Sequence, residues 1–211
     1  MGAMKDRSKT SAPPNKHRER TEATLRELLD AAERIFVRDG FERAQLETIA
    51  AETGRTRGAV YAHFKSKQDL FLALLERRAR TRMDEVKDEV QRAKSQRERK
   101  QIVRKAFVGA MLDPDWALLL LEFKLFALRN RESQARLRAL KEMLSQEKNS
   151  LFSGSAKIGG RQRAALDLSF AVLRGIPSAL VLESKFDPAL ASVEKTRALL
   201  AAIFDAVMPE E

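Results

Sequence analysis

The side chains between residues 57 and 67 are of the types that bind nucleic acid. Arg57 carries a planar guanidinium, which can donate to the O6 and N7 atoms of guanine in the DNA major groove. Ala59 offers a methyl group that can contact thymine. Four further side chains can donate hydrogen bonds to phosphate oxygens, namely Tyr61, His63, Lys65 and Lys67. One base-reading group beside several phosphate donors predicts a surface that binds DNA.

Two short predicted helices position this cluster. An apolar stripe indicates a helix over residues 46–53, and Gly54 ends it in a turn that needs a positive φ. Thr56 then serves as the N-cap of a second helix, residues 57–63. A short helix, a glycine turn and another short helix form the pattern of a helix-turn-helix, whose second helix lies in the major groove. The sequence therefore predicts a recognition helix that begins near Thr56.

The rest of the chain repeats its apolar residues at the spacing of helices. Residues 25–36 form one such stripe, which Gly40 ends. Ser66 caps a long helix that runs to about residue 95. The later helices are predicted at about 101–112, 116–130, 132–152, 161–183 and 188–207, with Pro114 at the start of the second and a kink at Pro177 in the fourth. Because no strand alternation of useful length occurs, we expect an all-α fold.

Composition excludes several classes of protein. The chain has 211 residues, 40 Lys and Arg against 30 Asp and Glu, and a formal net charge of +10, which favours a polyanionic partner. It has no cysteine and only two histidines, His17 and His63, so we expect no metal site, thiol nucleophile or cofactor. The spacing of Gly154 and Gly159 lacks the Lys-Ser/Thr and the strand of a phosphate-binding loop, and no hydrolase motif is present. We therefore expect no enzyme.

The first twenty residues are polar and basic, and we expect them to form a mobile arm. This arm either contacts the minor groove of DNA or remains a solvated tail. We take Met4 as the natural start. A secretory signal and an apolar run long enough to cross a bilayer are both missing from the sequence, so we expect a cytoplasmic, nucleoid-associated bacterial protein.

Between residues 26 and 76 the chain resembles the DNA-binding domain of the TetR (tetracycline-repressor-like) family of bacterial transcriptional regulators. The resemblance is carried by Ile49-Ala50, Gly54, Gly58, Val60-Tyr61, His63-Phe64, Ser66-Lys67 and Leu70-Phe71. It implies a three-helix DNA-binding domain at residues 21–67 and a ligand-binding and dimerisation domain of about six helices at residues 68–211. It also implies a homodimer on a palindromic operator, usually a repressor, that a small-molecule effector releases.

The resemblance assigns roles within the motif, and two residues depart from its pattern. The DNA-binding positions are Gln45, Thr56, Arg57, Ala59, Tyr61, His63, Lys65 and Lys67. Gln45 stands where members often have Thr or Ser, and it can donate to phosphate or read adenine. Glu47 stands where several members have a basic or neutral residue. It would weaken DNA binding unless it accepts from cytosine N4 or turns away from the DNA.

In this family the effector pocket lies among the middle helices. Here those helices carry Phe107, Met111, Trp116, Leu120, Phe123, Phe126 and Phe170. Such a pocket suits an apolar or aromatic effector, whereas the alternative is that these residues form an ordinary core. Glu122 interrupts an apolar helix, with Arg129 two turns further along the same face. We expect both to line the pocket, and a structural ion pair is the alternative.

The last two predicted helices carry apolar stripes that suit a dimer interface. The first stripe comprises Ala165, Leu168, Val172, Gly175, Ala179 and Leu182, and the second comprises Leu190, Val193, Leu200, Phe204 and Val207. The two-fold symmetry that a palindromic site requires favours an exposed, self-complementary surface. The alternative is that both stripes are buried inside one protomer.

A second kind of protein also fits the pattern, namely a helical adaptor in which the helix-turn-helix segment is purely structural. The clustering of donors at one end of the motif, from Arg57 to Lys67, favours the DNA-binding regulator. DNA binding that falls steeply with salt distinguishes the regulator from the adaptor.

Overall fold

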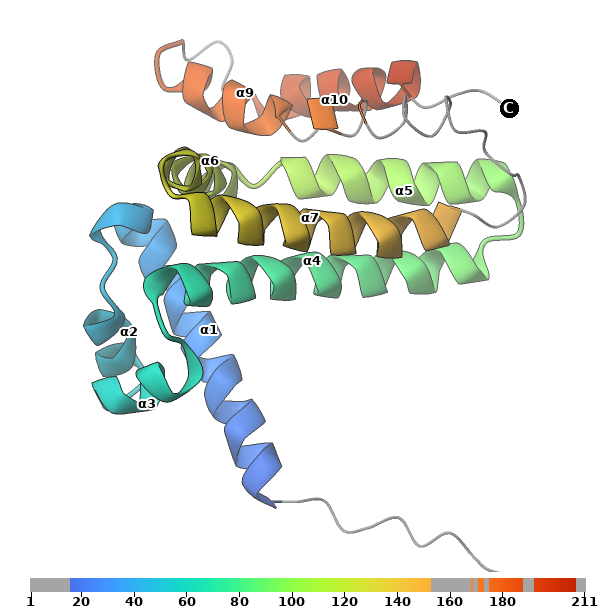
Figure 1. Ribbon diagram of the computed structural model, residues 1–211. Coiled ribbons are helices and arrows are strands. Elements are labelled where there is room, and N and C mark those ends of the chain that lie inside the picture. The colour runs from blue at the N-terminus through green and yellow to red at the C-terminus, as the bar shows by residue number, and fades with distance from the viewer. Residues whose placement is uncertain (1–15, 153–167, 169–170, 173–174, 188–191, 208–211) are drawn as a thin grey trace, which may run out of the picture.

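The computed structural model describes residues 16–152, 168, 171–172, 175–187 and 192–207, and every regular element in these ranges is an α-helix (Figure 1). The helices are α1 (Lys16–Arg43), α2 (Leu46–Glu52), α3 (Arg57–His63), α4 (Lys67–Arg92), α5 (Gln96–Met111), α6 (Pro114–Arg129), α7 (Arg131–Phe152), α9 (Ile176–Ser184) and α10 (Val193–Val207). The prediction of an all-α fold is confirmed in this part of the chain.

Side-chain caps fix where most of these helices begin. At the start of α3, the Thr56 hydroxyl accepts a hydrogen bond from Ala59 N (3.2 Å), and at the start of α4 Ser66 accepts one from Asp69 N (3.1 Å). Each cap satisfies a backbone donor that the first helical turn leaves without a partner. Ser95, Asp113 and Asn130 act in the same way before α5, α6 and α7. The caps predicted at Thr56 and Ser66 are confirmed.

Helices α1, α2 and α3 project from one end of a bundle (Figure 1). In the bundle, α4 packs against α5 and α7, α6 packs against α1, α7 and α9, and α10 packs against α5. The core of the projecting part is formed by Leu28, Ile35 and Phe36 of α1, Ile49 of α2 and Val60 of α3, all fully buried. A second core lies between α5 and the last two helices, around Val108 and Leu200. The buried side chains of the first core pack the helix-turn-helix against α1.

A cluster of aromatic rings joins α1, α4 and α6. Phe71 of α4 stacks on Phe123 of α6 with ring centroids 4.3 Å apart, and on Trp116 at 5.8 Å. Phe41, at the end of α1, meets Phe123 edge-on at 5.0 Å. Such contacts add to the free energy of burying the rings. The cluster therefore fixes the N-terminal helices to the bundle at the level of α6.

Several element boundaries differ from those predicted. Helix α1 begins at Lys16, so residues 16–20 of the predicted arm are helical, and residues 1–15 lie outside the described part. Helix α5 begins at Gln96 instead of residue 101. Pro177 lies in the first turn of α9, where its missing N–H costs nothing, so it begins a helix and does not kink one.

Candidate nucleic-acid interface

The turn between α2 and α3 has the geometry that its glycine permits. Gly54 adopts φ 64°, a left-handed conformation that side chains with a Cβ rarely take. The backbone N–H of Arg55 donates a hydrogen bond to Ala50 O over 2.9 Å, which closes the turn. Gly40 adopts φ 79° and interrupts α1 as predicted. The helix-turn-helix is thus set by one tight turn and by the buried face of its two helices.

Helix α3 presents one face to solvent. Val60 is fully buried, whereas Arg57, Gly58, Tyr61 and Ala62 are exposed. The base-reading and phosphate roles predicted for Arg57 and Tyr61 require this exposure. Gly58 and Ala62 were not predicted on this face, although their spacing from Arg57 and Tyr61 was a signal for it. A face with two small residues lets a groove wall approach the helix closely.

The Arg57 guanidinium is held between two other side chains. Its Nε lies 2.9 Å from Glu47 Oε1, its Nη2 donates to Tyr61 Oη over 3.4 Å, and its Cζ lies 5.2 Å from the centroid of the Tyr61 ring. The hydrogen bond to Tyr61 and the charge of Glu47 raise the pKa of Arg57 above its ordinary value. The Glu47 side chain therefore points toward Arg57.

Other predicted DNA-binding side chains lie around this face. Gln45, Thr56 and Lys65 are exposed, whereas Ala59 and His63 are half-buried. Thr56 precedes α3, Lys65 follows it, and Gln45 precedes α2. Their contacts with phosphates, and the contact of Ala59 with thymine, stay predictions.

Lys67 makes contacts within the protein that were not predicted. Its Nζ donates to the backbone oxygens of Glu42 (2.7 Å) and Ala44 (3.0 Å), and it lies 5.0 Å from the centroid of the Phe41 ring. Burial lowers the pKa of Lys67, and the charge of Glu42 opposes this shift. The side chain is directed at the turn between α1 and α2, where it uses two of its three donors, and its contact with phosphate stays a prediction.

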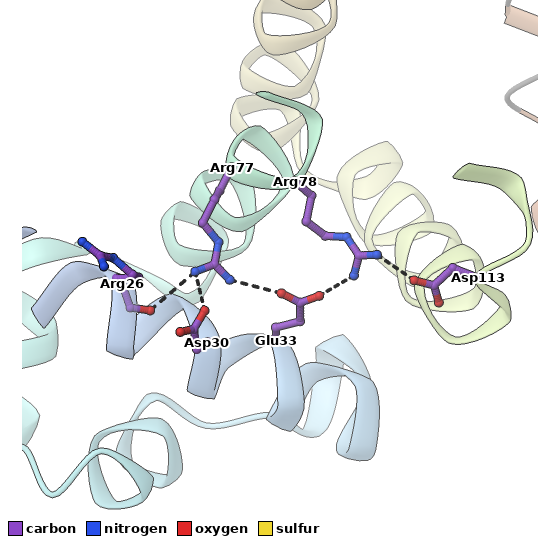
Figure 2. A network of polar contacts seen from close by, with 6 residues as sticks. All are labelled: Arg26, Asp30, Glu33, Arg77, Arg78 and Asp113. Carbon is purple, nitrogen blue, oxygen red and sulfur yellow. Dashed lines mark hydrogen bonds and ion pairs between the residues drawn. The ribbon is translucent and has the colours of Figure 1, made fainter. Parts of the chain in front are cut away.

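An ionic network fixes α1 to α4 and to the start of α6 (Figure 2). Arg77 Nη1 pairs with Asp30 Oδ1 at 2.6 Å and its Nη2 with Glu33 Oε2 at 3.1 Å. Arg78 pairs with the same Glu33 and with Asp113 Oδ2, the latter at 2.6 Å, and its Cζ lies 4.2 Å from the centroid of the Trp116 ring. These paired charges connect the start of α6 to the helix that supports α2 and α3.

Glu122 accepts a backbone hydrogen bond across the same junction. Its Oε2 lies 2.7 Å from the N–H of Phe41, the residue that follows the break at Gly40. A Cβ added to Gly40 would lie 2.8 Å from this oxygen, so a larger residue there would displace the carboxylate. Glu122 thus has a structural partner inside the protein, and that partner is a backbone amide, whereas Arg129 is exposed.

We expect Glu122→Ala to lower the free energy of unfolding by about 1–3 kcal/mol, because the part-buried Phe41 N–H then loses its acceptor. Glu122→Gln keeps an oxygen acceptor and should lose distinctly less. Chemical denaturation at fixed protein concentration measures both values. Equal losses for the two variants would contradict this assignment of Glu122.

The predicted effector-pocket residues of α6 belong to the aromatic core. Phe123 is fully buried, so it cannot touch a ligand in this arrangement, and its assignment to the pocket is corrected. Trp116 and Phe126 pack on the same core, and Phe107 of α5 packs on Phe204 with ring centroids 5.4 Å apart. The rings fill the space between the helices. Contact of Trp116, Phe126 and Phe107 with an effector stays a prediction.

The described structure does not bring the other predicted effector-pocket residues together around one cavity. Leu120 is half-buried, while the side chain of Met111 and all of Phe170 lie outside the described residues. Two described cavities lie elsewhere. One, of about 670 Å³, lies between the start of α4 and the start of α7 and includes His63, Asp69 and Arg136. The other, of about 400 Å³, lies between α4 and α7.

The two predicted dimer stripes differ in their exposure to solvent. In the first, Leu168 (67%), Val172 (56%) and Leu182 (40%) are exposed, as are Gly175 and Ala179. In the second, Leu200 and Phe204 are fully buried against α5 inside the protomer. Their assignment to an exposed surface is therefore wrong, because α10 turns this stripe inward. The side chain of Val207 lies outside the described residues.

Within the described ranges, no helix is long and apolar enough to cross a membrane. The same ranges contain no group of three or more His, Asp or Glu side chains that could hold a metal ion.

Sequence comparison finds a family for the N-terminal helices. Residues 28–74 match the sequence model of bacterial regulatory proteins of the tetR family. The transcriptional repressor AcnR of Corynebacterium glutamicum is 43% identical over 63 residues, which cover 30% of this chain and 33% of that protein. The match thus spans about a third of the length of this curated relative. The similarity includes the helix-turn-helix and its supporting helix.

Structural comparison covers most of the chain. A TetR-family transcriptional regulator from Mesorhizobium loti aligns with a TM-score of 0.67 at 21% identity, covering 89% of this chain and 96% of that one. The regulator FadR of Bacillus subtilis, solved in complex with stearoyl-CoA, aligns with a TM-score of 0.61 at 18% identity, covering 83% and 97%. At these identities the comparison shows a shared fold, from α1 through the C-terminal bundle.

Proposed function

We propose that this chain, whose residues 28–74 match the tetR family of bacterial regulatory proteins, is a ligand-responsive transcriptional regulator that binds DNA. The observation that carries the proposal is the exposed face of α3, where Arg57 and Tyr61 stand on a helix whose other side is buried. Helix α3 enters the major groove, and α2 crosses the phosphate backbone beside it. Arg57 donates to a base edge, and the groups around α3 donate to phosphates.

The two parts of the chain have separate tasks in this proposal. Residues 21–67 bind DNA, and residues 68–211 bind an effector and form a homodimer. The repressor AcnR supports repression as the mode of action, and the stearoyl-CoA held by FadR of Bacillus subtilis supports an effector with apolar surface. The protein works in the cytoplasm, on the bacterial chromosome. Effector binding releases the operator by moving α6 against α1 and α4.

Selection of bound duplexes from a random DNA pool tests this function. We expect enrichment of an inverted repeat whose half-sites lie about 34–36 Å apart, or a multiple of one helical turn. Binding to the enriched duplex should fall steeply with salt, with a slope of about −0.9 per phosphate contacted. A pool that shows no enrichment, or binding that ignores salt, would contradict the proposal. Screening of apolar small molecules for release then identifies the effector.

The proposed dimer uses the exposed stripe that contains Leu182 of α9. Leu182→Glu places a charge where two copies of this stripe would meet, so we expect it to shift the protein from dimer to monomer at micromolar concentration. Val37→Glu changes an equally exposed apolar residue of α1 and should leave the dimer intact. Sedimentation velocity measures both. A dimer that survives Leu182→Glu unchanged would show that the interface lies elsewhere.

A further inference from the structure

Glu47 is an acidic residue on a surface that is proposed to face a polyanion. It lies in the first turn of α2, which the helix-turn-helix geometry places beside the phosphate backbone. Both members of its ion pair are largely open to solvent, with 47% of the Glu47 side chain and 66% of the Arg57 side chain exposed. A carboxylate in this position opposes DNA binding by its charge alone. A compensating role has to come from its contact with Arg57.

The geometry of that contact leaves Arg57 able to read a base. Glu47 lies against the Nε side of the guanidinium, and Tyr61 takes one donor of Nη2. Arginine has five N–H donors in a fixed plane, so donors on Nη1 and Nη2 remain for guanine O6 and N7. The carboxylate on one side and the Tyr61 ring 5.2 Å from Cζ restrict the rotamers of a long, flexible side chain. An arginine ordered before binding loses less conformational entropy when it meets the base.

We propose that Glu47 is a positioning residue for DNA recognition: it holds Arg57 in the orientation that reads one base pair and so determines operator specificity through Arg57. This inference rests on the proposed function and adds to it a residue that makes no base contact itself. Glu47 lowers affinity for every duplex through its charge and raises the preference for the correct one through Arg57. The net effect is a more selective and weaker-binding surface.

The experiment compares three duplexes: the selected operator, the same operator altered at the base pair that Arg57 reads, and an unrelated sequence. Glu47→Gln should raise affinity for the unrelated duplex severalfold, because it removes one negative charge. It should also lower the ratio of affinities for the intact and altered operators by about three- to tenfold, since a neutral amide oxygen holds the guanidinium more weakly than the carboxylate does. In the background of Arg57→Ala, the same change should leave that ratio within about twofold, because the two residues act as one unit.

Glu52→Gln is the matched control. Glu52 lies on the same helix and loses the same charge, but it pairs with Arg34 of α1, 2.6 Å away, and not with Arg57. It should leave the ratio of intact to altered operator unchanged. Melting temperatures of all variants, measured without DNA, report whether the helix-turn-helix remains folded.

Each outcome has a distinct meaning. If Glu47→Gln and Glu52→Gln act alike on all three duplexes, Glu47 contributes charge alone and the inference fails. If Glu47→Gln relaxes the preference at a different base pair from Arg57→Ala, Glu47 reads a base directly and the inference also fails. If the unaltered protein selects no duplex at all, the proposed function itself fails, and this result is separate from the other two.

Discussion

Replacing Phe123 with alanine should lower the free energy of unfolding by about 3–5 kcal/mol. The ring is fully buried and lies between Phe71 of α4 and Phe41 at the end of α1, with centroids 4.3 Å and 5.0 Å away. Its removal leaves a cavity where three helices meet, and the rings around it lose their contacts. Chemical denaturation at fixed protein concentration measures the loss, because the proposed dimerisation would make apparent stability depend on concentration.

Leu125→Ala is the control for this prediction. Leu125 lies two residues further along α6 and half of it is exposed, so its truncation should change stability much less. The comparison also distinguishes a core residue from a pocket residue. If Phe123 lined an effector cavity, its truncation would leave stability nearly unchanged and would weaken effector binding instead. A loss no larger than that of Leu125→Ala would contradict the arrangement of the aromatic cluster.

Replacing Arg57 with alanine should abolish discrimination at one base pair of each half-site, a loss of about 1–3 kcal/mol, or about 5- to 150-fold in relative affinity. The guanidinium stands on the exposed face of α3 and has donors to spare after its contacts with Glu47 and Tyr61. Because the proposed operator has two half-sites, we expect the effect at symmetry-related positions. Competition between the operator and single-base variants measures it.

Two controls separate a base contact from a general loss of positive charge. Lys65→Ala removes an exposed charge beside α3 and should weaken binding to all duplexes alike, with a shallower salt slope. Arg55→Ala removes an arginine of the turn that pairs with Glu27 of α1 at 2.8 Å, and it should leave base preference unchanged. Identical behaviour of Arg57→Ala and Lys65→Ala would contradict the recognition role of Arg57.

Local signals predicted the helix-turn-helix well, because its determinants are local. Thr56 and Ser66 cap helices through backbone groups three residues away, and Gly54 takes its positive φ within a single turn. The start of α5 had a local signal as well. Ser95 followed by Glu98 is a capping pattern, and the Glu98 carboxylate accepts from Lys94 N at 2.8 Å. Apolar periodicity did not reveal this start, because most residues around Ser95 are charged or polar.

The contacts that the sequence did not predict join residues that are far apart along the chain. Glu122 bonds to an amide 81 positions earlier, and Lys67 reaches carbonyls 23 and 25 positions earlier. Periodicity marks the face of α6 that is apolar, but it does not say whether Phe123 meets another helix or a ligand. The same limit applies to α10, whose stripe turned out to pack inward through Leu200 and Phe204. Helix positions follow from local rules, whereas the partner of each face is set by tertiary packing.

We expect α3 to lie in the major groove with Arg57 against a guanine, and one measurement tests this contact directly. In the selected operator, 7-deazaguanine is placed at the base pair where Arg57→Ala loses discrimination, which removes the N7 acceptor and leaves base pairing intact. We expect this duplex to bind the unaltered protein about five- to tenfold more weakly than the normal operator, and Arg57→Ala equally well in both forms. Equal affinity of the unaltered protein for both duplexes, or the same loss in Arg57→Ala, would contradict the claim.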